Sequence, residues 1–155
     1  LMLTASGPKV IEFNCRFGDP ECQALMPLMG LELGSVLFAC ARGELDNAPK
    51  LSFARSFSAC IVAASKGYPE KPKKGDKISI NLDSNDSLQI FHAGTTLDQF
   101  NNIITSGGRV LSVVAQGKSF NKAFDLAYQS IKKINFNGMH YRKDIGYQVR
   151  KNTLN

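Results

Sequence analysis

Alternating apolar and polar residues predict a β-strand over residues 9–17, KVIEFNCRF. Residues 1–4 and the turn formers at 5–8 precede it, so the pattern indicates a hairpin over residues 1–17. The side chains of a strand alternate between two faces, and here one face is apolar: Ile11, Phe13, Cys15 and Phe17. We interpret Cys15 as a small buried hydrophobe. The opposite face carries Glu12, Asn14 and Arg16.

Helical patterns follow this strand. The triplet Asp19-Pro20-Glu21 is typical of a helix start, with Asp at the cap, Pro in the first turn and an acid near the positive helix end. Helices are predicted within residues 20–29 and 31–45, and Gly43 suits the end of the second. Residues 46–50, DNAPK, are typical of a linker.

Short strand patterns dominate the rest of the chain: residues 57–65, 76–82, 88–94 and 109–117. One clear helix is predicted over residues 119–134, with Ser119 at its N-cap, and a last element covers residues 140–149. The second part is therefore predicted to be a compact α+β unit whose strands are mostly antiparallel.

Composition is typical of a globular protein, with 43% hydrophobic residues among 155. The apolar runs are too short to cross a bilayer, so no membrane partner is expected. The opening LMLTASG reads like the middle of a strand, and we expect the sequence to be the C-terminal part of a longer protein. The four cysteines form no CxxC pair and the two histidines lie far apart, which favours reduced thiols in a cytoplasmic protein over a zinc site.

The polar face of the first strand can carry chemistry. Glu12 and Asn14 place two oxygen ligands about 6–7 Å apart along one surface, and Mg²⁺ favours hard oxygen donors. Arg16 could bind a carboxylate or a phosphoryl oxygen, and the helix start at Gly18 and Asp19 favours an anion. These groups suit phosphoryl transfer onto a carboxylate. From spacing alone, a surface strand with an ordinary Glu–Arg pair remains the simpler interpretation.

Five motifs in this order resemble the phosphoribosylamine–glycine ligase (glycinamide ribonucleotide synthetase) family of ATP-grasp enzymes: GPKVIEFNCRFGDPE at 7–21, AASKGYP at 63–69, FHAGT at 91–95, GGRVLSVVAQG at 107–117 and YRKDIGYQV at 141–149. The similarity spans nearly the whole chain. It implies that residues 1–46 end an ATP-grasp core. Residues 51–155 would form the family's C-terminal domain, a small, mostly antiparallel, rudimentary single-hybrid-like domain with one main helix.

The resemblance also implies roles for individual residues. Glu12 and Asn14 would hold the Mg²⁺ or Mn²⁺ that bridges the ATP phosphates. Arg16 would be the catalytic residue that steadies the glycine carboxylate or its acyl phosphate. Gly18 and Asp19 would lie beside this small substrate, together with Arg16.

The implied reaction ligates glycine to 5-phosphoribosylamine through glycyl phosphate, with ATP as the phosphoryl donor, in purine biosynthesis. An N-terminal domain and a lid of the same enzyme are the implied partners, so residues 1–155 alone should be inactive. Glu21 is interpreted as stabilising its helix start, and Arg109 and Arg142 as forming surface salt bridges.

Two alternatives stay open at this point. Another ATP-grasp carboxylate–amine ligase would keep Glu12, Asn14 and Arg16 in the same roles with a different acid or amine. A small basic nucleic-acid-binding module would use the formal charge of +6, much of which lies in the lysine-rich segment 66–77. Single-strand binders interleave aromatic and basic residues, however, and Tyr68 is the only aromatic residue in that segment, so no nucleic-acid partner is expected.

Overall fold

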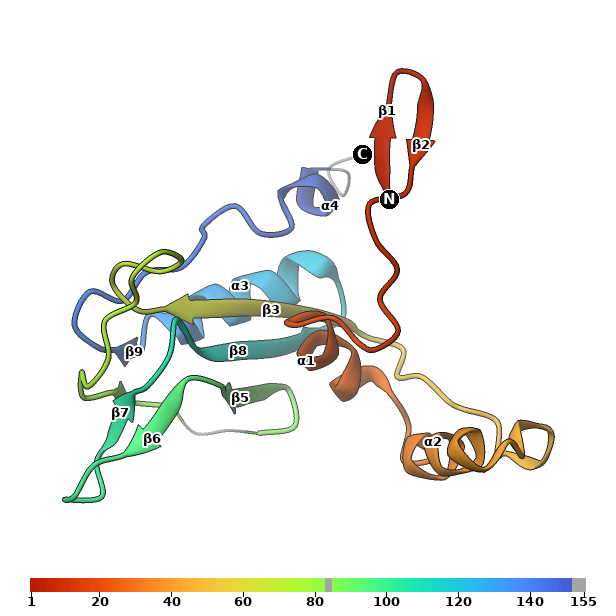
Figure 1. The fold of residues 1–155 in the computed structure, drawn as a ribbon, viewed down its shortest axis with the longest axis horizontal. Helices are drawn as coiled ribbons and strands as arrows, with labels where there is room; N and C mark the ends of the chain where they lie inside the picture. Colours follow the sequence, from red (N-terminus) through yellow and green to blue (C-terminus); the bar gives the residue numbers. More distant parts are fainter. Residues whose placement is uncertain (83–84, 152–155) are drawn as a thin grey trace.

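A computed structural model describes residues 1–82 and 85–151 of the chain. The first third of the chain forms a hairpin and short helices. The hairpin and α2 (Leu33–Arg42) project from the main body of the molecule (Figure 1). In order, these elements are β1 (Met2–Thr4), β2 (Gly7–Lys9), α1 (Glu21–Leu25), η1 (Met26–Leu28), α2 (Leu33–Arg42) and η2 (Leu45–Asn47). Gly43 ends α2 in the left-handed conformation, with φ of 71°, as its position predicts.

A three-stranded antiparallel sheet forms the centre, in the order β3-β8-β5 (Figure 1). Its strands are β3 (Phe57–Ala64), β8 (Arg109–Gly117) and β5 (Leu88–His92). Two small antiparallel pairs accompany it: β4 (Ser79–Ile80) with β9 (Ile134–Asn135), and β6 (Thr95–Leu97) with β7 (Ile103–Thr105). The chain then reaches α4 (Tyr147–Lys151). The predicted α+β class with mostly antiparallel strands is confirmed.

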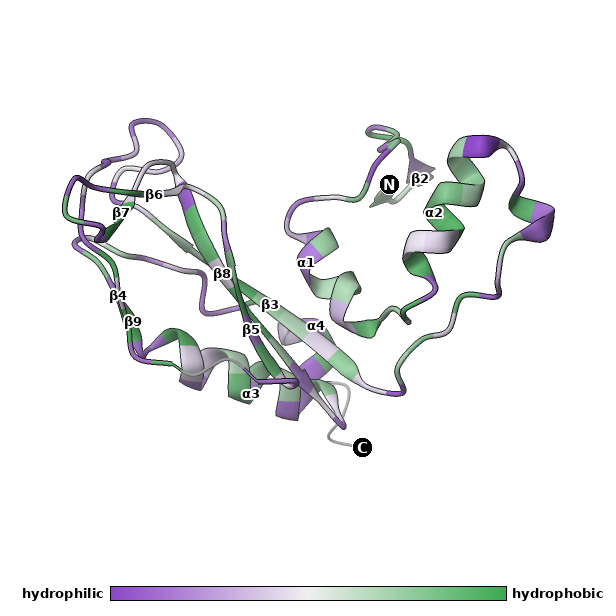
Figure 2. Cartoon of the chain, turned by 90° about the horizontal axis from the view of Figure 1, so that it is seen from below, coloured by the Kyte–Doolittle hydropathy of each residue, from purple (hydrophilic) through white to green (hydrophobic). Residues whose placement is uncertain are grey.

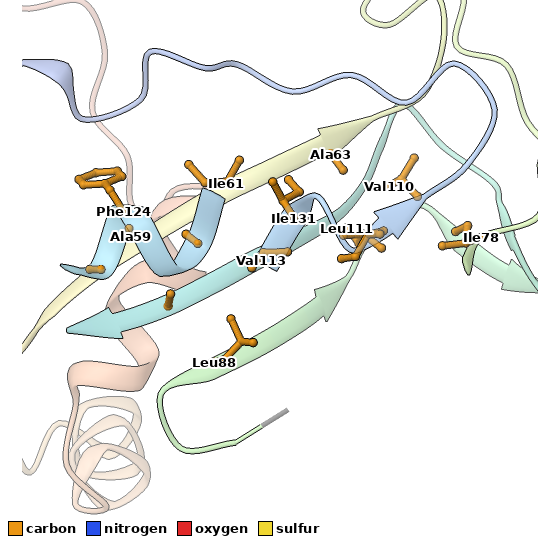
Figure 3. Close-up of a cluster of buried hydrophobic side chains, with 14 of the residues drawn as sticks. Ala59, Ile61, Ala63, Ile78, Leu88, Val110, Leu111, Val113, Phe124 and Ile131 are labelled. Carbon is orange, nitrogen blue, oxygen red and sulfur yellow. The ribbon is translucent and has the colours of Figure 1, made fainter. Parts of the chain in front are cut away.

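Helix α3 (Phe120–Ile131) covers one face of this sheet and encloses the core (Figure 3). Its buried residues follow the spacing of one helix face: Ala123, Phe124, Ala127, Ser130 and Ile131. They meet the residues of β3 that share a face, Ala59, Ile61 and Ala63. Ser119 caps the helix as predicted, since its hydroxyl accepts a hydrogen bond from the Lys122 amide at 3.3 Å.

Helix α1 lies on the opposite side of the sheet from α3 (Figure 2). Cys60 and Val62 of β3 point to this side, and their register partners on β8 are Val114 and Ser112. Both partners are buried. The N-terminal segment therefore contacts the face of the sheet that points away from α3.

The predicted strand over residues 9–17 is wrong beyond Lys9. The hairpin register pairs Met2 with Lys9, so residues 10–17 have no partner strand among the described residues. They run without regular structure to a bend at Cys15 and Arg16. The apolar face is not buried either, because Phe13 is 84% exposed and Cys15 is exposed. The expectation of a buried Cys15 is therefore also wrong.

Three of the quoted motifs meet at one end of the sheet. A Cβ atom on Gly94 would lie 2.7 Å from both the Gly107 Cα and the Arg109 carbonyl oxygen, so glycine permits the close approach of two backbones there. A Cβ atom on Gly108 would overlap the ring of Tyr68. Gly94 and Gly108 therefore permit the close packing at this end of the sheet. In the described residues, no helix is long and apolar enough to cross a membrane.

Candidate functional site

Glu12 and Asn14 lie next to each other on the irregular segment that follows β2. The Asn14 amide nitrogen donates to the Glu12 carboxylate at 3.4 Å, and both side chains are exposed to solvent. The structure therefore brings these two predicted metal ligands together, although no strand holds them. The carboxylate and amide oxygens supply two hard donors, which suits a divalent cation that completes its shell with phosphate oxygens and water.

The described residues do not complete a metal shell around Glu12 and Asn14. Among residues 1–82 and 85–151, no three His, Cys, Asp or Glu side chains gather closely enough to hold a metal ion. A cation at Glu12 and Asn14 would thus depend on oxygen atoms from a nucleotide, from water or from another part of the protein. This fits Mg²⁺, which often takes only one or two protein ligands.

Arg16 lies in a bend and not on the expected strand. The bend at Cys15 and Arg16 breaks the two-residue alternation, and the Arg16 guanidinium donates to the Phe17 carbonyl at 3.0 Å. This bond uses one of five N–H groups, so the side chain is still able to bind an anion. The structure does not join Arg16 to Glu12 and Asn14 by a direct contact.

Gly18 and Glu21 form the helix start in an arrangement that the sequence did not indicate. The Glu21 carboxylate reaches back and accepts a hydrogen bond from the Gly18 amide at 2.8 Å. Pro20, not Asp19, occupies the cap position, and no side chain caps the helix. The predicted Asp19 cap is therefore wrong, whereas the interpretation of Glu21 as stabilising the helix start agrees with the structure.

Asp19 is engaged elsewhere. One carboxylate oxygen accepts from the Arg109 guanidinium at 2.7 Å, and the other accepts from the Gln23 amide at 3.2 Å. The salt bridge expected for Arg109 is thus confirmed, and Arg142 likewise pairs with Asp144 at 2.8 Å. No local sequence pattern indicates that Asp19 is the partner of Arg109, because 90 residues separate Asp19 from Arg109.

A groove of about 260 Å³ runs between this segment and the sheet. Pro20 lines it from the N-terminal side, and Cys60, Val62 and Arg142 line it from the other. Burial raises the pKa of the Cys60 thiol to about 11; a hydrogen bond with Ser112 opposes this effect and the charge of Asp19 adds to it.

We expect Cys60 to resist alkylation in the folded protein. At pH 8.5, a thiol with a pKa of about 11 instead of 9.0 has roughly 100-fold less thiolate, the reactive form. Iodoacetamide labelling followed by mass spectrometry should therefore modify Cys60 about 100-fold more slowly in the native protein than in urea. Equal rates in both states would contradict the assigned environment.

Comparison with known proteins now places these observations in a family. The profile described as phosphoribosylglycinamide synthetase, C domain, matches residues 58–148, and that of the ATP-grasp (A) domain of the same synthetase matches residues 1–22. Phosphoribosylamine–glycine ligase of Caulobacter vibrioides is 43% identical over 150 residues, which is 96% of this chain and 35% of that protein. Its counterpart in Caldanaerobacter subterraneus is 47% identical over 145 residues, or 94% and 34%.

A solved structure agrees. The crystal structure of phosphoribosylamine–glycine ligase from Thermotoga maritima superposes with a TM-score of 0.79 at 30% identity, covering 92% of this chain and 34% of that one. This chain spans about a third of the length of these relatives. The two matches overlap the first and the last of the motifs that carry the resemblance. The chain belongs to the phosphoribosylglycinamide synthetase family.

Proposed function

We propose that this chain is part of an ATP-dependent ligase that joins glycine to 5-phosphoribosylamine and forms glycinamide ribonucleotide, ADP and phosphate. Residues 1–46 would end the ATP-grasp core, and residues 51–155, of which 83–84 and 152–155 lie outside the described part, would form the C-terminal domain. The observation that carries the proposal is the 43–47% identity to proteins named phosphoribosylamine–glycine ligase.

The site residues take roles that fit their chemistry. Glu12 and Asn14 would hold Mg²⁺ or Mn²⁺ through their side-chain oxygens, and the contact between the two side chains supports this role. The metal, when bound, would neutralise charge on the ATP phosphates. Arg16 would steady the glycine carboxylate or the acyl phosphate, and Gly18 and Asp19 would line the glycine site.

The reaction has two balanced steps. A carboxylate oxygen of glycine attacks the γ-phosphorus of ATP, the bond to the β–γ bridging oxygen breaks, and ADP leaves. The amine of phosphoribosylamine then attacks the acyl carbon and loses a proton, and inorganic phosphate departs with the former carboxylate oxygen. Neither step needs a side-chain nucleophile, so positioning and charge neutralisation by Arg16 and its neighbours supply the catalysis.

The exposed apolar side chains before Arg16 support the view that more protein packs here. Ile11 is 64% and Phe13 84% exposed, and they alternate with the proposed metal ligands. Large apolar residues exposed together mark a surface that another element covers. We propose that the N-terminal and lid parts of the same enzyme cover it in the cytoplasm, so residues 1–155 alone do not turn over substrate.

Oxygen transfer provides the test. Full-length enzyme is supplied with Mg²⁺, ATP, phosphoribosylamine and glycine labelled with ¹⁸O in its carboxylate. Each turnover should yield one ADP and one phosphate that carries one ¹⁸O atom, because a carboxylate oxygen leaves with the phosphate. Unlabelled phosphate would contradict glycyl phosphate. Activity only with a different acid or amine would favour another ATP-grasp carboxylate–amine ligase.

A further inference from the structure

Arg109 joins the sheet to the candidate site by two hydrogen bonds to a single residue. Its Nη2 lies 2.7 Å from the Asp19 carboxylate, and its Nη1 donates to the Asp19 carbonyl oxygen at 3.0 Å. One planar guanidinium thus fixes both the side chain and the backbone of Asp19. A lysine side chain has only one nitrogen and cannot hold both Asp19 acceptors in this fixed geometry.

The base of this contact is well anchored. Arg109 opens β8, pairs with Ala64 of β3, and its carbonyl accepts a hydrogen bond from the Gly94 amide at 2.9 Å. The close packing of Gly94 on Gly107 adds a second constraint beside it. The guanidinium therefore projects from a rigid corner of the sheet rather than from a free loop.

The other end of the contact is a segment with no strand partner. Glu21 holds the Gly18 amide, and Gln23 holds the second Asp19 oxygen, but both belong to the same short stretch. Among the described residues, Arg109 is the side chain of the central sheet that hydrogen-bonds Asp19, the residue that follows Gly18. Without it, the packing of α1 on β3 and β8 would remain, but this packing does not fix the Asp19 carboxylate and carbonyl groups.

We infer that Arg109 is a positioning residue, which sets the place of Gly18 and Asp19 at the glycine site from the C-terminal domain. This inference rests on the proposed function. The pair is 41% and 52% exposed, so solvent screens its charges and it adds little to stability. The pair matters because it fixes the position of Asp19, and small displacements of groups that hold a substrate reduce turnover strongly.

Steady-state kinetics of the full-length enzyme tests the inference. R109M should lower kcat/KM for glycine roughly 10- to 100-fold and leave the KM for ATP within about twofold, since Glu12 and Asn14 precede the held segment. D19N should lower it similarly. The loss in the double variant should be smaller than the product of the two single losses, because both substitutions act on the same contact between Arg109 and the Asp19 carboxylate. R109K, which keeps the charge, should recover only part of the loss.

The chain offers a matched control in Arg42. Its guanidinium forms a two-pronged pair with Glu44, with both distances 2.9 Å, at the end of α2. R42M should leave both KM values unchanged. Thermal unfolding of each variant separates misfolding from misplacement, and R109K serves if R109M fails to fold.

The outcomes are separable. Normal glycine kinetics in folded R109M or R109K would overturn the inference and leave the proposed function intact. Multiplicative losses in the double variant would also overturn it, because Arg109 would then act independently of Asp19. An unsubstituted enzyme without glycine-dependent ADP formation would overturn the proposed function and the inference with it.

Discussion

Replacing Glu12 by glutamine should lower the turnover of the full-length enzyme by roughly 100-fold or more while leaving its stability nearly unchanged. The substitution removes a negative charge and one strong oxygen donor from the proposed cation site. Glu12 is exposed, and its contact with Asn14 at 3.4 Å is long for a hydrogen bond. The stability of the fold should therefore change little, while the affinity for the cation and the rate of phosphoryl transfer should fall strongly.

The measurement is glycine-dependent ADP release across a range of Mg²⁺ concentrations. Part of the loss should be recovered at high Mg²⁺, because a weakened site still fills by mass action. Glu44→Gln makes the same chemical change at an exposed position just after α2 and should keep full activity. Undiminished turnover in Glu12→Gln would rule out its proposed role.

Local patterns predicted the elements whose stability is local. Helix α3 appears with its Ser119 cap, and α2 ends at Gly43 in the left-handed conformation. Strand β3 and strand β8 lie where apolar runs indicate them. For the two helices, the determining groups lie within a few residues of each other, so the local sequence contains the cause. The two strands also need each other, because β3 pairs with β8.

The failures share a different cause. Residues 10–17 have the alternation of a strand, but a strand also needs a partner for its backbone hydrogen bonds, and the described residues provide none. Asp19 has the character of a helix cap, but its carboxylate binds Arg109 and Gln23 instead. Such long-range competition for one side chain leaves no trace in local spacing.

The candidate site shows the same division. A spacing of two residues predicts that the side chains of Glu12 and Asn14 lie close together, and in the structure they are in contact. The orientation of Arg16 depends on a bend that the alternation did not indicate. The contribution of the sheet through Arg109 depends on the complete fold.

Ile61→Ala should destabilise the sheet domain by about 2–5 kcal/mol, the range for truncating a buried aliphatic side chain to alanine. Ile61 is 0% exposed, pairs with Val113 and faces α3 in the core (Figure 3). Removing three carbon atoms there leaves a cavity between β3, β8 and α3, because the strand register restricts how far the walls can move inward.

Leu97→Ala is the matched control, because Leu97 is also aliphatic but 59% exposed on β6. It should change stability by less than about 1 kcal/mol. Urea unfolding, combined with hydrogen exchange of peptides from β3 and β8, separates loss of this domain from loss of the rest of the enzyme. Equal effects of the two substitutions would mean that the sheet–α3 core does not govern the stability of the domain. The anchoring of Arg109 by that sheet would then need another source.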